Sequence, residues 1–254
     1  MEIESNKQLT FDQKYDKILD QISGRFTWFV ISGFFCGMLC QTWFMYGLTY
    51  YELMPTDFLC KKDEIWVKCA RDDFCTASQP IQWKIDYSTN KALHNYVEKL
   101  NLTCASKITV GLIGSSFFFG WAFSLLWVPR LADIYGRQMI YRIALIVTIA
   151  LFVGEYACSN VNLMIVLNFL IGVTMTCRMS VGYVYMMEYV KLAMQPKLCT
   201  VWGVCDAMVY LIITIYFTQI SKYWHYITYI GVVQVLWATF VAFLTPESPK
   251  FLLN

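Results

Sequence analysis

The sequence predicts an all-α membrane protein with six transmembrane helices. Of its 254 residues, 57% are hydrophobic and only 15% are charged, whereas a soluble domain averages about 45–50% apolar and about 25% charged residues. Six stretches reach the roughly 20 apolar residues that a spanning helix needs. They cover residues 26–50, 108–128, 139–158, 163–187, 201–220 and 226–244. A long polar insert, residues 52–107, separates the first helix from the second.

The positions of lysine and arginine predict the orientation of these helices. Short loops that carry Lys and Arg face the cytoplasm, and Arg130, Arg137 and Arg142 lie between the second and third helices. We therefore expect both termini on the cytoplasmic side, or on the matrix side of a mitochondrion, and the insert on the opposite side. The sequence does not separate a plasma membrane or endomembrane from the mitochondrial inner membrane.

The chain divides into five segments by this pattern. A polar segment, residues 1–25, precedes the first helix, residues 26–51. The insert follows at residues 52–107, the other five helices occupy residues 108–244, and residues 245–254 form a C-terminal cytoplasmic or matrix segment.

The insert carries four of the ten cysteines, Cys60, Cys69, Cys75 and Cys104. An even number of cysteines in a loop outside the cytosol predicts two disulfides, with three pairings open. Four free thiols are the alternative. A zinc site is less favoured, because the close cysteine spacing of zinc motifs is missing and His94 is the only imidazole nearby.

Several short motifs carry a family resemblance when they are taken together and in order. They are Trp83-Lys84-Ile85-Asp86 in the insert, Asp133-Ile134-Tyr135-Gly136-Arg137 after the second helix, Glu188-Tyr189 at the end of the fourth, and Pro246-Glu247-Ser248-Pro249-Lys250-Phe251-Leu252 after the sixth. This series resembles the N-terminal half of the organic cation/anion transporters, a family of the major facilitator superfamily. The resemblance implies the N-terminal six-helix domain of that fold, a 3+3 inverted repeat, with an external cysteine-containing loop after the first helix.

The matching charges fall at the cytoplasmic ends of the helices. The resemblance implies that such a cluster helps to hold the inward-closed state by latching helix ends together. The alternative is interface charge that only follows the positive-inside rule. The residues of this cluster are Asp133, Gly136, Arg137, Glu188, Glu247 and Lys250.

Three charged residues fall inside the predicted helices, namely Glu155, Arg178 and Asp206. Charges at this depth are functional candidates by default. Arg178 precedes Glu188 by ten residues, which is about 15 Å along a helix. We expect Arg178 to have an acceptor within hydrogen-bond reach, from Asp206, Glu188 or backbone carbonyls. Asp206 on the neighbouring helix could reach Arg178, as an interhelical ion pair or as a shared contact for a substrate or coupling ion. Glu155 lies near the outer end of its helix, where its side chain can extend to water.

The sequence also departs from the family pattern. Pro129 replaces a glycine, Asn168 an arginine, and Ile134 and Gln138 replace basic residues. The second helix carries an aromatic run, residues 117–127, where the family has small residues. Small faces allow helices to slide closely past each other. Bulky rings favour a fixed contact with lipid or with another protein.

Three hypotheses of function follow, because the chain corresponds to one half of such a transporter. We favour a non-transporting structural subunit of a larger membrane assembly, of which a respiratory complex is one example. The alternative is a carrier for an organic ion or polar metabolite, working by alternating access as a dimer of halves or with a C-terminal half. The third is a solute sensor.

The same observations define the expected partners and exclude other classes of protein. The expected partners are the lipid bilayer, other membrane-protein subunits and a second copy in a homodimer. A net charge of +2 is too small for a nucleic-acid surface. We predict no enzyme, cofactor or metal, because no nucleophile, phosphate-loop or metal motif is present.

Overall fold

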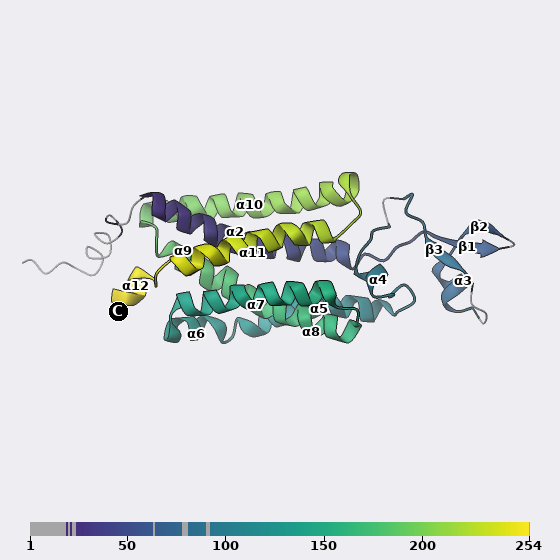
Figure 1. Cartoon of the computed structure of the whole chain (residues 1–254), viewed down its shortest axis with the longest axis horizontal. Helices are drawn as coiled ribbons and strands as arrows, with labels where there is room; N and C mark the ends of the chain where they lie inside the picture. Colours follow the sequence, from purple (N-terminus) through teal and green to yellow (C-terminus); the bar gives the residue numbers. More distant parts are fainter. Residues whose placement is uncertain are drawn as a thin grey trace, which may run out of the picture.

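The computed structural model describes residues 19, 21, 24–62, 64–77, 81–89 and 92–253. Most of the predicted polar segment, residues 1–25, therefore lies outside the described residues. Long helices run along one axis, and a small three-stranded sheet lies beyond one end of the helix bundle (Figure 1). The short helix α12 (Pro249–Leu253) lies at the opposite end.

The long helices follow the predicted apolar stretches. They are α2 (Gly24–Tyr51), α5 (Lys107–Ser124), α7 (Arg137–Ala157), α8 (Val161–Thr176), α10 (Gln195–Ile215) and α11 (His225–Leu244). Two π-helical segments, η1 (Cys177–Val181) and η3 (Tyr216–Ile220), prolong α8 and α10, and α9 (Gly182–Met187) continues from η1. A 3-10 turn, η2 (Leu192–Met194), precedes α10. In the described part of the chain, five helices are long and apolar enough to span a membrane, or six if a bent pair is one span.

The bent pair corrects the predicted second helix, residues 108–128. Helix α5 ends at Ser124, and α6 (Val128–Tyr135) continues at an angle of 46°. Pro129 lies in the first turn of α6, where its missing N–H costs no helical hydrogen bond. The proline that departs from the family pattern therefore begins a new helix.

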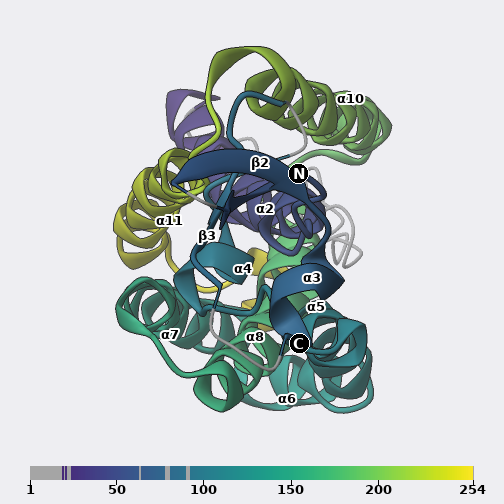
Figure 2. The same cartoon turned by 90° about the vertical axis from the view of Figure 1, so that its right-hand side faces the viewer.

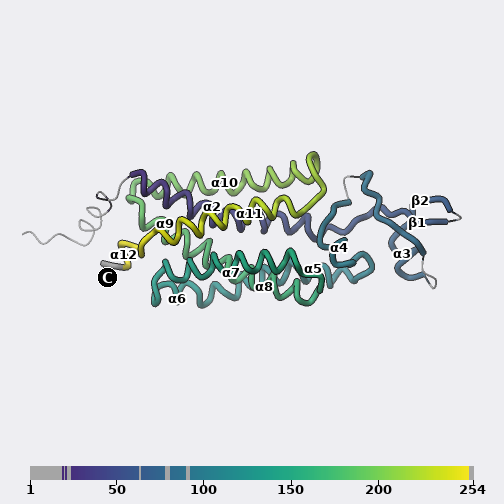
Figure 3. The backbone as a smooth tube through the Cα atoms, viewed as in Figure 1, coloured from purple at the N-terminus to yellow at the C-terminus, as the bar shows by residue number. Residues whose placement is uncertain are grey.

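The insert folds into a small subdomain. Figure 3 shows the backbone passing from α2 through this subdomain and then into α5. Strands β1 (Phe58–Lys62), β2 (Ile65–Cys69) and β3 (Trp83–Ile85) form an antiparallel sheet in the order β2-β1-β3. Helix α3 (Arg71–Cys75) follows β2. Phe58 and Phe74 are buried beneath the sheet, because a subdomain this small has little other apolar surface to bury.

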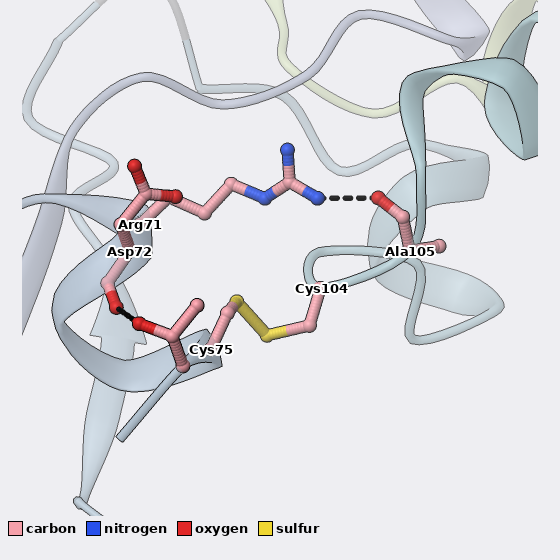
Figure 4. The surroundings of a disulfide bond; sticks show 6 residues. Arg71, Asp72, Cys75, Cys104 and Ala105 are labelled. Atoms are coloured by element: carbon pink, nitrogen blue, oxygen red, sulfur yellow. Dashed lines mark hydrogen bonds between the residues drawn. A yellow bond between two sulfur atoms is a disulfide. The ribbon is translucent and has the colours of Figure 1, made fainter.

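Two disulfides hold this subdomain. Cys60 is bonded to Cys69, and Cys75 is bonded to Cys104 just before α5. Figure 4 shows the second bond, together with a hydrogen bond from the Arg71 guanidinium to the Ala105 carbonyl oxygen. Both contacts attach α3 to the start of α5.

The helix contacts follow the pattern of two exchanged three-helix units. Helix α5 packs on α8, and α10 packs on α2; helix α7 packs on α8, and α11 packs on α2. Exchanging the unit α2–α5–α7 with the unit α8–α10–α11 converts each of these contacts into another of them. This arrangement is what a 3+3 repeat produces.

Glycines set the closest helix contact, between α5 and α8. A Cβ atom added to Gly120 would lie 2.1 Å from the Phe169 carbonyl oxygen, and one added to Gly172 would lie 2.0 Å from the Phe117 carbonyl oxygen. The two backbones therefore touch directly. Phe117 is buried against Phe44 of α2, so the aromatic run of the second helix partly faces the protein core.

Candidate functional site

Arg178 lies at the centre of the bundle, in the π-helical segment η1, and its side chain is 0% exposed. Its guanidinium donates to Gln41 Oε1 and to Cys40 Sγ (2.9 Å), both on α2. It also donates to the Thr174 carbonyl oxygen and to Thr174 Oγ1, each at 3.3 Å. Because all these acceptors are neutral groups, Arg178 is a buried cation held by dipoles.

Asp206 lies on α10 and also faces α2. Its carboxylate accepts hydrogen bonds from Thr42 Oγ1 (3.0 Å) and from the Tyr46 hydroxyl (2.9 Å). Asp206 and Tyr46 are both partly exposed, so this carboxylate, unlike Arg178, is open to a ligand.

Aromatic and hydroxyl groups continue from Asp206 along the contact between α2 and α10. The rings of Tyr46 and Tyr210 lie 5.3 Å apart, and the Tyr50 hydroxyl donates to Thr214 Oγ1 (3.3 Å). Tyr46 and Tyr50 are four residues apart, as are Asp206, Tyr210 and Thr214, so each set lies on one helix face. We call these five residues the α2–α10 seam.

Of the acceptors predicted for Arg178, a backbone carbonyl is present, that of Thr174, but the structure does not bring Arg178 and Asp206 together. Both bind α2, Arg178 through residues 40 and 41 and Asp206 through residues 42 and 46. Successive residues on a helix point about 100° apart, so the two charges approach α2 from different sides. Among the ion pairs of the described residues, none joins Arg178 to Asp206.

Glu155 is placed differently from the prediction as well. Its side chain does not reach water but is 0% exposed, and its carboxyl accepts a hydrogen bond from the Tyr96 hydroxyl (2.5 Å). Tyr96 belongs to the short helix α4 (Tyr96–Lys99) of the insert. The sequence could not show that this segment covers the end of the third helix.

The predicted cytoplasmic cluster forms at the ends of three helices. Arg137 binds the carboxylate of Glu188 and also that of Asp133 (3.4 Å). Glu188, only 7% exposed, accepts a further hydrogen bond from Ser248 Oγ. The start of α7, the end of α9 and the residue before α12 are therefore joined through one buried carboxylate.

Glu247 and Gly136 complete the cluster. The Glu247 carboxylate accepts from the backbone N–H of Gln138 (3.2 Å) and of Ser248 (2.9 Å). Gly136 has a φ of +93°, and a Cβ there would lie 2.5 Å from Glu247 Oε2. A helix N-terminus attracts a carboxylate, and glycine gives Glu247 room to reach it. Lys250 joins through its backbone N–H, which donates to Ser248 Oγ (3.2 Å).

Sequence reasoning missed several residues of both sites. Gln41 and Tyr46 look like ordinary members of an apolar helix, and only a four-residue spacing could have drawn attention to Tyr46 and Tyr50. Tyr189 is predicted only as part of the Glu188-Tyr189 motif, without a role, and it donates to the Pro246 carbonyl oxygen (2.6 Å). Burial raises the pKa of Tyr189, so its phenol stays neutral and remains a donor.

Residues 73–252 match the model of the Major Facilitator Superfamily. The chain belongs to this superfamily. The matched region includes Arg178, Asp206 and every residue of the predicted cytoplasmic cluster.

The relatives found for this chain have names that describe metabolite transport. The Inner membrane metabolite transport protein YgcS of Escherichia coli (strain K12) is 27% identical over 163 residues, covering 61% of this chain and 36% of that protein. YfiG and YncC of Bacillus subtilis (strain 168), also named as metabolite transport proteins, are 27% and 28% identical over 61% and 62% of this chain and 33% and 34% of their own lengths. The chain thus spans about a third of the length of these relatives.

Proposed function

We propose that this chain is the six-helix half of a transporter that carries a polar metabolite or organic ion across a membrane. The superfamily match supports transport better than the hypothesis of a structural subunit. The observation that carries the proposal is Asp206, a partly exposed carboxylate within the membrane with two neutral donors and no cation partner among the described residues. A charge at this depth is costly, which makes Asp206 a functional candidate by default.

The chemistry of the α2–α10 seam favours a cationic or hydroxyl-rich solute. A carboxylate beside the rings of Tyr46 and Tyr210 offers charge attraction together with cation–π contact, and the hydroxyls of Tyr50 and Thr214 add hydrogen bonds. The resemblance to organic cation/anion transporters is consistent with a cation. Alternating access would require a second half, either a C-terminal continuation or another copy of this chain.

The test is uptake by proteoliposomes that contain the complete natural protein. Labelled tetraethylammonium, para-aminohippurate and glucose represent a cation, an anion and a neutral solute. We expect saturable uptake of the cation, reduced about 10-fold or more by Asp206→Asn, since a hydrogen bond or ion contact to a charged group contributes about 1.5–3 kcal/mol. Asp72→Asn, an exposed carboxylate in α3, is the matched control.

One observation favours the structural-subunit hypothesis as a second candidate. Phe118, Phe119 and Phe123 of α5 are 47–66% exposed, and rings of this kind provide large contact areas at fixed geometry. Under this hypothesis the purified native protein carries stoichiometric partner subunits on α5, and none of the three solutes enters the vesicles above the rate of protein-free ones.

A further inference from the structure

The insert holds the outer end of the bundle through a short covering segment. Figure 2 shows α4 lying over this end, between α11 and α7 on one side and α5 on the other. Asn95 Nδ2 donates to the carbonyl oxygens of Tyr50 (3.0 Å) and Leu53 (2.7 Å). Lys99 Nζ donates to the carbonyl oxygens of Glu155 (2.7 Å) and Tyr156 (2.8 Å). Helix α4 therefore closes the ends of both α2 and α7.

A carboxyl group is sealed beneath this cover. Glu155 and Tyr96 are both 0% exposed, and the Tyr96 hydroxyl donates to Glu155 Oε1 (2.5 Å). Glu155 Oε2 has no hydrogen-bond partner among the described residues. No ion pair of the described chain includes Glu155, because the ammonium of Lys99 is engaged by backbone carbonyls instead.

These contacts suit a neutral carboxyl and not a carboxylate. An ionised carboxylate removed from water needs a cation or several donors, and Glu155 has a single phenol. We propose that Glu155 is a proton-binding residue, protonated while α4 is docked, that exchanges its proton with the outer solution when α4 is released. The ligand of this site is therefore a proton, and its binding does not depend on whether the chain transports a solute.

The surrounding charged and titratable groups allow this exchange. Lys99 is the one cation that faces Glu155 from α4; burial lowers the pKa of Lys99, and Glu155 opposes that shift. Tyr51 of α2 and Cys158 after α7 are also near, but neither becomes a cation. The ring of Trp224, the residue before α11, lies with its centroid 5.3 Å from Lys99 Nζ. When Glu155 ionises, Lys99 is positioned to leave the carbonyls and pair with it.

The test is an infrared titration of the complete natural protein in lipid nanodiscs, following the C=O stretch of protonated carboxyls. Burial raises the pKa of Glu52 to about 8, so Glu52→Gln is the parent in which Glu155 is observed. We expect a carboxyl band that persists at pH values where exposed carboxyls, with pKa near 4, have ionised. Adding Glu155→Gln should remove this band. Adding Glu64→Gln, at an exposed turn, should leave it intact.

A second variant covers the case in which Glu155→Gln does not fold. Tyr96→Phe removes the only donor to the carboxyl among the described residues. The ionised form then loses a hydrogen bond, so the midpoint should move about one unit to higher pH. Any of three results would overturn the proposal. The first is the absence of a carboxyl band at pH values where exposed carboxyls have ionised. The others are a band that survives Glu155→Gln and a midpoint that does not move in Tyr96→Phe.

Hydrogen exchange tests the release of α4. After correction for intrinsic exchange rates, amides of residues 96–101 should lose protection above the midpoint in the parent. They should stay protected in the Glu155→Gln variant. Equal protection on both sides of the midpoint in the parent would show that the proton leaves without release of α4.

Discussion

Arg178 shows at the scale of one residue how a membrane charge can be held without a counter-charge. Its side chain is fully buried, and its acceptors come from Gln41, Cys40 and Thr174. A charge in this position was predictable from the sequence, but its partners were not. Electrostatics alone favours an aspartate as the partner of Arg178. Which groups meet depends instead on the direction in which each side chain leaves its helix.

A double-variant cycle tests this arrangement. Gln41→Leu removes one of the three side-chain acceptors of the guanidinium and should lower the free energy of unfolding by about 1–3 kcal/mol. Arg178→Met in the same protein removes the unpaired charge, so the double variant should recover at least half of that loss. Thermal unfolding in detergent measures both, with Thr200→Val on the exposed face of α10 as control. A double variant less stable than Gln41→Leu alone would contradict this view of Arg178.

At the scale of helices, most of the fold could be predicted and the contacts could not. Apolar runs located the long helices to within a few residues, since lipid imposes that pattern directly. The exception is α10, which begins at Gln195, six residues before the predicted start at 201. The 46° bend before α6 was hidden, because residues 125–128 are as apolar as the helix before them. The position of α4 over Glu155 was hidden too, because a polar loop carries no periodic signal for where it docks.

The glycine contact between α5 and α8 gives a prediction at this scale. Gly120→Ala and Gly172→Ala each place a methyl against backbone atoms of the facing helix, so each should destabilise the protein by about 1–3 kcal/mol. Gly111→Ala and Gly203→Ala are matched controls, because nothing lies within 4 Å of the added Cβ. Alanine also favours helix, so these controls should unfold at or above the parent temperature. Equal effects at all four sites would show that α5 and α8 are not in close contact.

For the whole molecule, the two disulfides differ in what they constrain. Cys60–Cys69 closes a loop with a sequence separation of 9, and Cys75–Cys104 one with a separation of 29. Loop-closure entropy then makes the second worth about 1 kcal/mol more. Replacing Cys75 and Cys104 by serine should therefore increase hydrogen exchange in β1 and β3 more than replacing Cys60 and Cys69. The reverse order would show that strain or residual structure outweighs chain entropy.

The orientation of the whole molecule stays a prediction from the Lys and Arg pattern. The sheet and α12 lie at opposite ends of the bundle (Figure 1). Cysteines introduced by Glu64→Cys and Lys250→Cys, in a background with Cys199→Ser, should therefore react with an impermeant maleimide from opposite sides of sealed vesicles. Labelling of both from one side would refute the topology.

The π-helical segment η1 has a consequence for comparing this chain with its relatives. A π turn holds one residue more than an α turn, and each residue of a helix adds about 100° of rotation. The residues from Gly182 to Glu188 are thus turned about the helix axis by the rotation of one residue, about 100°, relative to a regular continuation of α8. In an alignment, η1 behaves as a one-residue insertion stored inside a continuous helix. A relative with an unbroken α-helix here should align through Gly172 and again through Glu188 only if one gap is placed between residues 177 and 181.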